Sequence, residues 1–361
     1  MTDDTKRYDS ITVTPRENSE VELVGAIPLP HVAYYRTKAL AKLITSLELP
    51  GFRKGHVPET MVVKTLGEHA IMEETAEVAL KDAYPRIVAD EKLAVIGSPQ
   101  VTITKLASGN PIEFKITTAV VPEVILPDYK TLAKEVSDEY KGETVNVTDK
   151  EVEDVITQLR ENKWRIGHTK EAQSATPSSI EKKPDPSDLP ELTLDVVKGF
   201  GDFASIDDFK VKLKENIHLD KERKAKEKRR GALGEKLIAG TKVVLPRILV
   251  EGELEKMLAQ FKHDVAALGM PFPDYLKKIN KTEDDLRNEW KKDAEKRATL
   301  QFALNAIAQK ENITASPEDI GRETSHILTH HKDAKEESVR IYVTTLLTNE
   351  KVFQFLEGAI D

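Results

Sequence analysis

The sequence predicts an α+β N-terminal domain followed by an all-α C-terminal domain of helical arms, in a multidomain and elongated molecule. The first third mixes alternating apolar patterns with helical ones. Residues 170–190 are rich in proline, serine and charge, and the chain after Leu192 carries only helical patterns. The expected segments are residues 1–135, residues 136–190 (a capped helix plus a linker) and residues 191–361.

The N-terminal segment is expected to contain four strands and three helices. Apolar and polar residues alternate along residues 10–15, 20–27, 101–106 and 112–121. Helical spacing runs from Pro30 to Leu47, then over residues 58–67 and 71–92. Gly67 is expected to end the second helix. Pro85 lies inside the third helix, where a proline costs about 3 kcal/mol, so we expect a kink or break near Tyr84.

The later segments are predicted to be helical around one linker. Thr148 and Glu151 have the spacing of a capping box, which predicts a helix start. A long helix is expected from Phe203 to about Ala239, and it carries seven bases and two acids between Lys221 and Arg230. Shorter helices are expected after Pro246, over 283–309, 317–331 and 335–358. Without a long heptad register these favour helix pairs over a rod-like coiled coil.

Composition excludes several classes of protein. The net charge of −8 argues against a general nucleic-acid coat protein. The chain has no cysteine, which excludes disulfides and thiolate metal sites. The first ten residues do not resemble a signal peptide, and no apolar run approaches the roughly 20 residues of a membrane helix. We expect a cytoplasmic protein without a membrane partner.

The sequence gives little indication of an enzyme active site. Glu323, His326 and His330 would share one face of a helix, which permits a zinc site and leaves a metal-dependent hydrolase as a remote alternative. The glutamate that a metalloprotease places after the first histidine is missing, so a solvated helix face is favoured. There is no glycine-rich phosphate loop or nucleophile elbow. We expect no catalytic residue, no metal and no cofactor.

The stretch "LPGFRKGHVPET" places an aromatic ring and two cations on a loop between helices. Phe52 lies between Gly51 and the pair Arg53 and Lys54. The ring either folds back onto the helix pair as a plug or stays exposed as an interface anchor, because exposed aromatics beside arginine are common in interfaces. The residue pattern alone leaves both readings open.

This loop resembles the signature of the bacterial trigger factor family. The pattern Gly-Phe-Arg-x-Gly-x-x-Pro is matched at Gly51, Phe52, Arg53, Gly55 and Pro58. The segment "VVPEVILPDY" is similar to the family's exit from its N-terminal domain, and "DLPELTLDVVKGFG" is similar to the entry into its helical C-terminal domain.

The resemblance implies a ribosome-associated chaperone. The ribosome-binding residues would be Gly51, Phe52, Arg53, Lys54, Gly55 and Pro58. The implied partners are a protein at the rim of the exit tunnel, the adjacent rRNA, and nascent or unfolded polypeptides, with the chain a monomer or weak homodimer. Candidate substrate-binding residues are Met257, Phe261, Met270 and Phe272, although for any one of them a core position is favoured.

One departure from the family is expected. Trigger factors usually carry a prolyl isomerase domain between the capped helix and the helical domain. The stretch between Arg160 and Asp188 is shorter than a typical domain of about 50 residues or more, so we expect no isomerase. A cytosolic holdase or assembly chaperone that never uses the ribosome is the alternative, and an architectural adaptor is a third reading.

Overall fold

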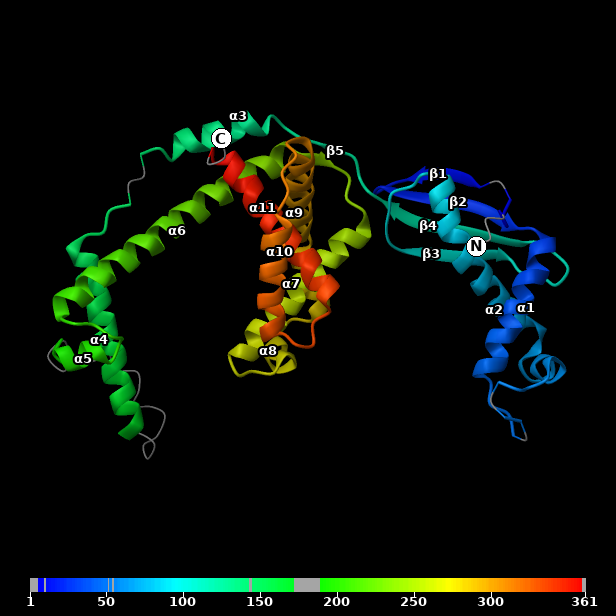
Figure 1. The fold of residues 1–361 in the computed structure, drawn as a ribbon, viewed down its shortest axis with the longest axis horizontal. Helices are drawn as coiled ribbons and strands as arrows, with labels where there is room; N and C mark the ends of the chain where they lie inside the picture. The colour runs from blue at the N-terminus through cyan, green and yellow to red at the C-terminus, as the bar shows by residue number, and fades with distance from the viewer. Residues whose placement is uncertain are drawn as a thin grey trace. The chain divides into compact units, whose positions relative to one another are not determined.

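A computed structural model describes residues 6–9, 11–50, 52–53, 55–142, 145–171 and 189–358, with side chains described up to Ile166 in the helix that ends at Glu171. The chain forms two compact units, each built from two separated stretches. Unit 1 comprises Met1–Pro127 and Gly240–Ile313, and unit 2 comprises Asp128–Ala239 and Thr314–Asp361. Both the α+β N-terminal part and the helical remainder that the sequence predicts are present (Figure 1).

The N-terminal part of unit 1 contains a four-stranded antiparallel sheet. Its strands are β1 (Thr12–Arg16), β2 (Glu20–Ile27), β3 (Val95–Lys105) and β4 (Ile112–Val120), in the order β1-β2-β4-β3. Leu23 pairs with Ile116, and Ile103 pairs with Phe114, so the apolar residues of neighbouring strands share one face. The four predicted strands are therefore confirmed.

Strand β3 is longer than the sequence predicts. The predicted strand begins at Val101, but residues 95–100 belong to β3 as well, and the register shifts between Ile96 and Gln100 as at a β-bulge. Gly97 has φ of +71°, a conformation that glycine adopts with least strain. Gly97 and Pro99 therefore mark an irregularity within β3 and not the place where the strand begins.

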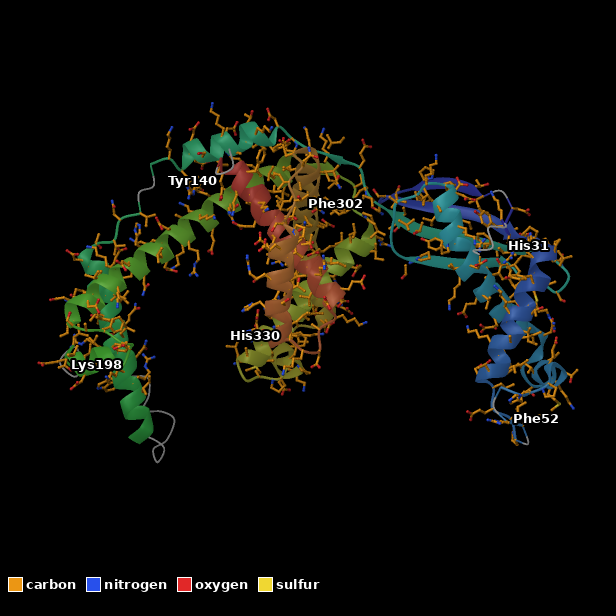
Figure 2. The ribbon with its side chains drawn as sticks, viewed as in Figure 1. His31, Phe52, Tyr140, Lys198, Phe302 and His330 are labelled. Carbon is orange, nitrogen blue, oxygen red and sulfur yellow. The ribbon has the colours of Figure 1, made fainter. Side chains whose placement is uncertain are left out.

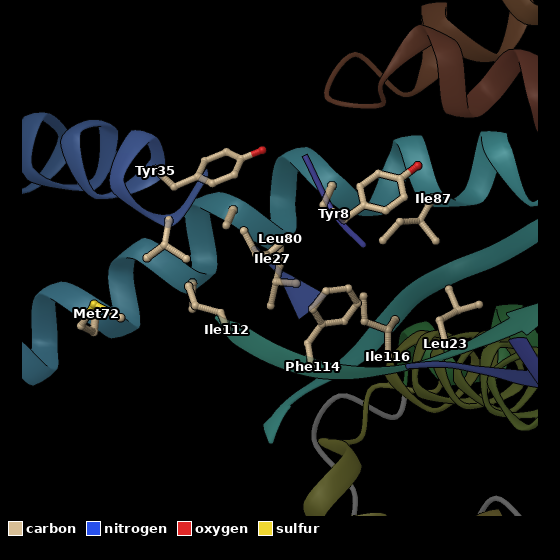
Figure 3. Close-up of a cluster of buried hydrophobic side chains, with 14 of the residues drawn as sticks. Tyr8, Leu23, Ile27, Tyr35, Met72, Leu80, Ile87, Ile112, Phe114 and Ile116 are labelled. Carbon is tan, nitrogen blue, oxygen red and sulfur yellow. The ribbon is translucent and has the colours of Figure 1, made fainter. Parts of the chain in front are cut away.

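Two helices pack with one face of the sheet to form the main core. They are α1 (Leu29–Ser46) and α2 (Glu59–Asp90). Figure 3 shows Leu23, Phe114 and Ile116 of the sheet beneath Leu80 and Ile87 of α2. Each fully buried apolar side chain of this size contributes about 1.5–3 kcal/mol. This core holds the α1–α2 hairpin on the sheet.

The expected interruption of α2 at Pro85 is wrong. The helix continues through Pro85 to Asp90, and its non-helical residue is Gly67, with φ of 81° and ψ of 158°. Ala83 and Ile87, on either side of the proline, are 1% and 0% exposed. Their burial against the sheet offsets the roughly 3 kcal/mol that a proline costs inside a helix. The predicted end of the preceding helix at Gly67 is confirmed, because the helical geometry stops there.

Unit 1 also contains a group of helices from later in the chain. Strand β5 (Val124–Ile125) pairs with β6 (Lys242–Val243), and helices α7 (Arg247–Ala267), α8 (Phe272–Ile279) and α9 (Glu283–Lys310) follow. Helices α7 and α9 pack as a pair around Val250, Leu254 and Ala294. The prediction of paired helices is confirmed here.

Unit 2 is entirely helical in its described residues. Its helices are α3 (Tyr129–Glu139), α4 (Asp149–Glu171), α5 (Leu194–Lys198), α6 (Ile206–Gly240), α10 (Pro317–His330) and α11 (Glu336–Leu356). Val152, Val197 and Phe209 bring α4, α5 and α6 together, whereas Val339 and Val343 join α10 to α11. Helix α3 was not predicted from the sequence; its capping bond runs from the Thr131 amide to the Asp128 carboxylate over 3.2 Å.

Two cations of the basic stretch of α6, Lys221 and Arg230, pair with acids of other helices. Lys221 lies 2.5 Å from Glu151, which completes the predicted capping box of α4 and whose pKa these contacts lower to about 2. Arg230 donates hydrogen bonds of 2.6–3.1 Å to the carboxylates of Glu350 and Glu357 on and just after α11. These two cations therefore cross-link helices of unit 2.

Acid should weaken the contact between α6 and α11. The Arg230 guanidinium lowers the pKa of Glu350 to about 2, below the value of about 4.3 for an unfolded chain. The stabilisation is then complete above about pH 4.3 and is lost as the pH falls towards 2. Because Glu350 is 39% exposed, we expect Glu350→Gln to cost about 1 kcal/mol at pH 7 and much less near pH 2.

Urea unfolding followed by circular dichroism at both pH values measures this difference. Glu215→Gln is the matched control, since Glu215 lies exposed on α6. An equal effect of Glu350→Gln at both pH values would show that the ion pair contributes nothing to folding.

Candidate functional site

The loop of residues 47–58 joins α1 to α2 at the end of the hairpin that lies away from the sheet. Figure 2 shows Phe52 at this tip. The Phe52 amide donates to the Leu49 carbonyl over 3.1 Å, and the His56 amide donates to the Arg53 carbonyl over 2.9 Å. Gly55 has φ of +81°, which a side chain would strain. These bonds form a compact double turn.

Apolar residues fix the base of this loop. Val57 is 3% exposed and packs in a cluster with Leu40, Val62 and Ile71. Leu49 packs against the same cluster from the other side of the tip. Pro58 then caps α2 with extended backbone angles of −60° and 143°. Leu49 on one side of the tip and Val57 on the other therefore attach the loop to the same apolar cluster.

The tip itself presents an aromatic ring and a cation to solvent. Phe52 is 39% exposed and is not a member of the apolar cluster beneath it. Arg53 is exposed, and no described residue forms an ion pair with it. The plug reading of Phe52 is therefore not supported. Gly51 and Lys54, two of the expected ribosome-binding residues, lie outside the described residues.

The base and the tip should respond differently to truncation. We expect Val57→Ala to lower the free energy of unfolding by about 2 kcal/mol, because it removes two methyl groups from a buried site. We expect Phe52→Ala to lower it by about 0.5 kcal/mol or less, because the ring is not part of a core. Urea unfolding of both variants measures the difference, and similar losses would mean that Phe52 is a packing residue.

The four candidate substrate-binding residues are half-buried. Phe261 lies edge-on to Phe272, Tyr275 and Trp290, with ring centroids 5.2–6.1 Å apart. Met257 packs against the α7–α9 core, and Met270 is intermediate in exposure. These side chains hold α7, α8 and α9 together while part of their surface remains in solvent. Their role in binding clients stays a prediction.

More exposed apolar residues escaped the sequence analysis. Leu268, directly after α7, is 80% exposed, and Ile341, Tyr342 and Leu346 on α11 are 63%, 60% and 48% exposed. A helical projection of α11 places Ile341 opposite the face that Val339 and Val343 bury, whereas Leu346 lies at the margin of that face.

The histidine motif does not form a metal site. The rings of His326 and His330 lie 5.2 Å apart in an edge-on contact on the exposed side of α10. Glu323 does not join them, because no group of three or more histidine, aspartate or glutamate side chains in the described part of the chain is placed to hold a metal ion.

Among the residues that the structure describes, no helix is both long enough and apolar enough to cross a bilayer.

The comparisons with known proteins agree with this architecture. Residues 10–159 match the family model described as bacterial trigger factor protein, and residues 205–356 match the model described as its C-terminus. The trigger factor of Halalkalibacterium halodurans is 24% identical over 85% of this chain and 87% of its own length. The trigger factor of Carboxydothermus hydrogenoformans is 25% identical over 92% and 93%.

One solved structure shares the fold. Its title is "Promiscuous Substrate Recognition in Folding and Assembly Activities of the Trigger Factor Chaperone". The TM-score is 0.55 with 17% sequence identity, and the likeness covers 98% of this chain and 100% of that one.

The two family matches, over a chain that combines a small sheet and helical hairpin with paired helices, place the protein in a class of ribosome-associated molecular chaperones. The chain belongs to the bacterial trigger factor family and is a short form of it. The two matched stretches leave only residues 160–204 between them, too little for the family's middle prolyl isomerase domain.

Proposed function

We propose that the protein docks at the ribosomal exit tunnel through the tip of the α1–α2 loop and shields nascent chains without catalysing prolyl isomerisation. The observation that carries the proposal is the exposed pair Phe52 and Arg53 on a turn anchored by the buried Val57. A ring and a cation presented on a turn whose base is anchored lose less conformational entropy on binding than they would on a free segment.

The chemistry of the tip suits a partner made of protein and RNA. Arg53 and Lys54 supply cations for rRNA phosphates and for acidic side chains of a protein at the tunnel rim. Phe52 supplies an apolar anchor of the kind that dominates many interfaces. Gly51 and Gly55 allow the tight backbone, and Pro58 sets the start of α2.

The three predicted segments are assigned different roles. We assign docking to residues 1–135, connection to residues 136–190, and client binding to residues 191–361. Partly exposed side chains such as Phe261, Phe272 and Met270 would hold unfolded segments weakly, because only part of each surface is free. A monomer or weak homodimer in the cytoplasm fits this role.

Replacing the tip should abolish docking. We expect the wild type to co-sediment with ribosomes at moderate salt and the variant Phe52→Ala, Arg53→Ala, Lys54→Ala to stay in the supernatant. The matched control, Tyr342→Ala, Lys332→Ala, Lys335→Ala, also removes one ring and two cations, all exposed on α11 or directly before it, and should pellet like the wild type. Higher salt should weaken the wild-type interaction, because phosphate contacts are screened.

If neither the wild type nor the control pellets, the protein is a holdase that works free of the ribosome, and the docking role of the tip is refuted. If the triple variant of the tip pellets as well as the wild type, docking uses another surface.

The purified chain should not accelerate prolyl isomerisation. We expect the rate of cis/trans exchange in a proline-containing peptide to equal the uncatalysed rate, since the stretch between Arg160 and Asp188 is shorter than a typical domain. A trigger factor that carries the isomerase domain is the positive control. Catalysis by the present chain at a comparable rate would refute the proposal.

A further inference from the structure

An apolar groove of about 600 Å³ lies between α2 and strand β3 in the N-terminal part of unit 1. Leu80, Tyr84 and Pro85 line it from the helix, and Val101 and Ile103 line it from the strand. It is separate from the α1–α2 loop and from the helices that follow β6. Neither docking through the α1–α2 loop nor client binding by residues 191–361 makes use of it.

The groove exists because α2 covers the middle of the sheet but not its edge. Val101 pairs with Ile116, and Ile103 pairs with Phe114, so all four lie on the face that α2 covers. Phe114 and Ile116 are both 0% exposed, whereas Val101 is 46% exposed on the same face. The inner face of β3 therefore lacks the cover that β4 has.

The hydrogen-bonding edge beside the groove is also open. β3 is an edge strand, and among the described strands it pairs with β4 alone. Alternate residues of such a strand direct their N–H and C=O groups away from the sheet. Pro99 and the register shift before Gln100 interrupt the first half of the edge. Regular pairing then runs from Gln100 to Ile103, where a second register shift follows before Lys105. The open edge and the apolar groove thus coincide.

The charge at one end of the groove is acidic. Three charged side chains line it: Glu73, Glu77 and Lys81. Lys81 lies 2.5 Å from Glu77 and compensates it, whereas Glu73 contacts the imidazole of His69 at 3.4 Å. The end near Glu73 therefore favours a basic group on the ligand.

We propose that this groove binds an extended apolar segment of an unfolded polypeptide, which adds to β3 as a further strand and places a basic residue near Glu73. Backbone hydrogen bonds to the open edge would supply affinity, and the groove would accept alternate apolar side chains. From Glu73 to Pro85 the helix spans about 18 Å, the length of about five residues in a strand. The inference rests on the chaperone role but not on ribosome docking.

Binding of a labelled peptide to the full-length chain tests the site. The probe is a fluorescein-labelled peptide of five alternating valine and threonine residues with lysine at one end, and its anisotropy is titrated with protein. Val101→Asn removes an apolar contact without adding charge, and we expect it to weaken binding about tenfold. Val24→Asn is the matched control, since Val24 is 40% exposed on the opposite face of the sheet next to the buried Leu23. It should bind within twofold of the wild type.

The mode of binding is tested with two N-methylated forms of the peptide, each blocking alternate amides. Strand addition requires that one form loses binding and the other retains it, because only one edge of the peptide faces β3. Equal binding of both forms would overturn strand addition, and unchanged binding by Val101→Asn would overturn the site. Ribosome co-sedimentation of Val101→Asn should equal that of the wild type, so failure of docking and failure of this site are distinguishable.

Discussion

The packing of α2 against the sheet is the constraint on which the N-terminal part depends. Phe114, Ile116 and Ile87 are each 0% exposed, and their burial holds α2 helical through Pro85. The same helix is the second arm of the hairpin that carries the tip loop. A hydrophobic core formed by other residues thus sets where Phe52 lies, and the Phe52 ring itself stays outside that core. The open groove along β3 has the same origin, because one helix cannot cover the full width of a twisted sheet.

In unit 2, electrostatics contribute to the contacts between α6 and its neighbours. Arg230 is 19% exposed and binds two carboxylates, Glu350 and Glu357, so its charge is compensated where solvent access is low. Lys221 performs a similar role towards α4 through Glu151. Few large side chains of α6 are buried along its middle, which is consistent with ion pairs assisting a modest apolar contact. Such pairs contribute less than a core, and a helical arm held in this way can retain apolar surface for weak, reversible contacts.

The errors of the sequence analysis share a physical cause. Local rules predicted an interruption near Pro85 and a start of β3 only at Val101, but Pro85 and residues 95–100 lie in elements that the surrounding core and the β4 ladder maintain. The same rules did not reveal α3, whose apolar stripe is short and becomes buried by packing within unit 2, where α3 contacts α11. Local propensities amount to about 1 kcal/mol or less per residue, with proline near 3, so tertiary burial overrides them.

By itself the sequence determined the four strands, most of the helices, the capping box at Thr148 and Glu151, and the loop motif at Gly51 to Pro58, because each depends on periodicity or on local backbone chemistry. Only the tertiary structure decided that Phe52 stays exposed above Val57, that the bases of α6 pair with distant acids, and that Val101 remains uncovered. These properties depend on which surfaces meet, and burial and ion pairing between residues far apart in the chain are not encoded in any local pattern.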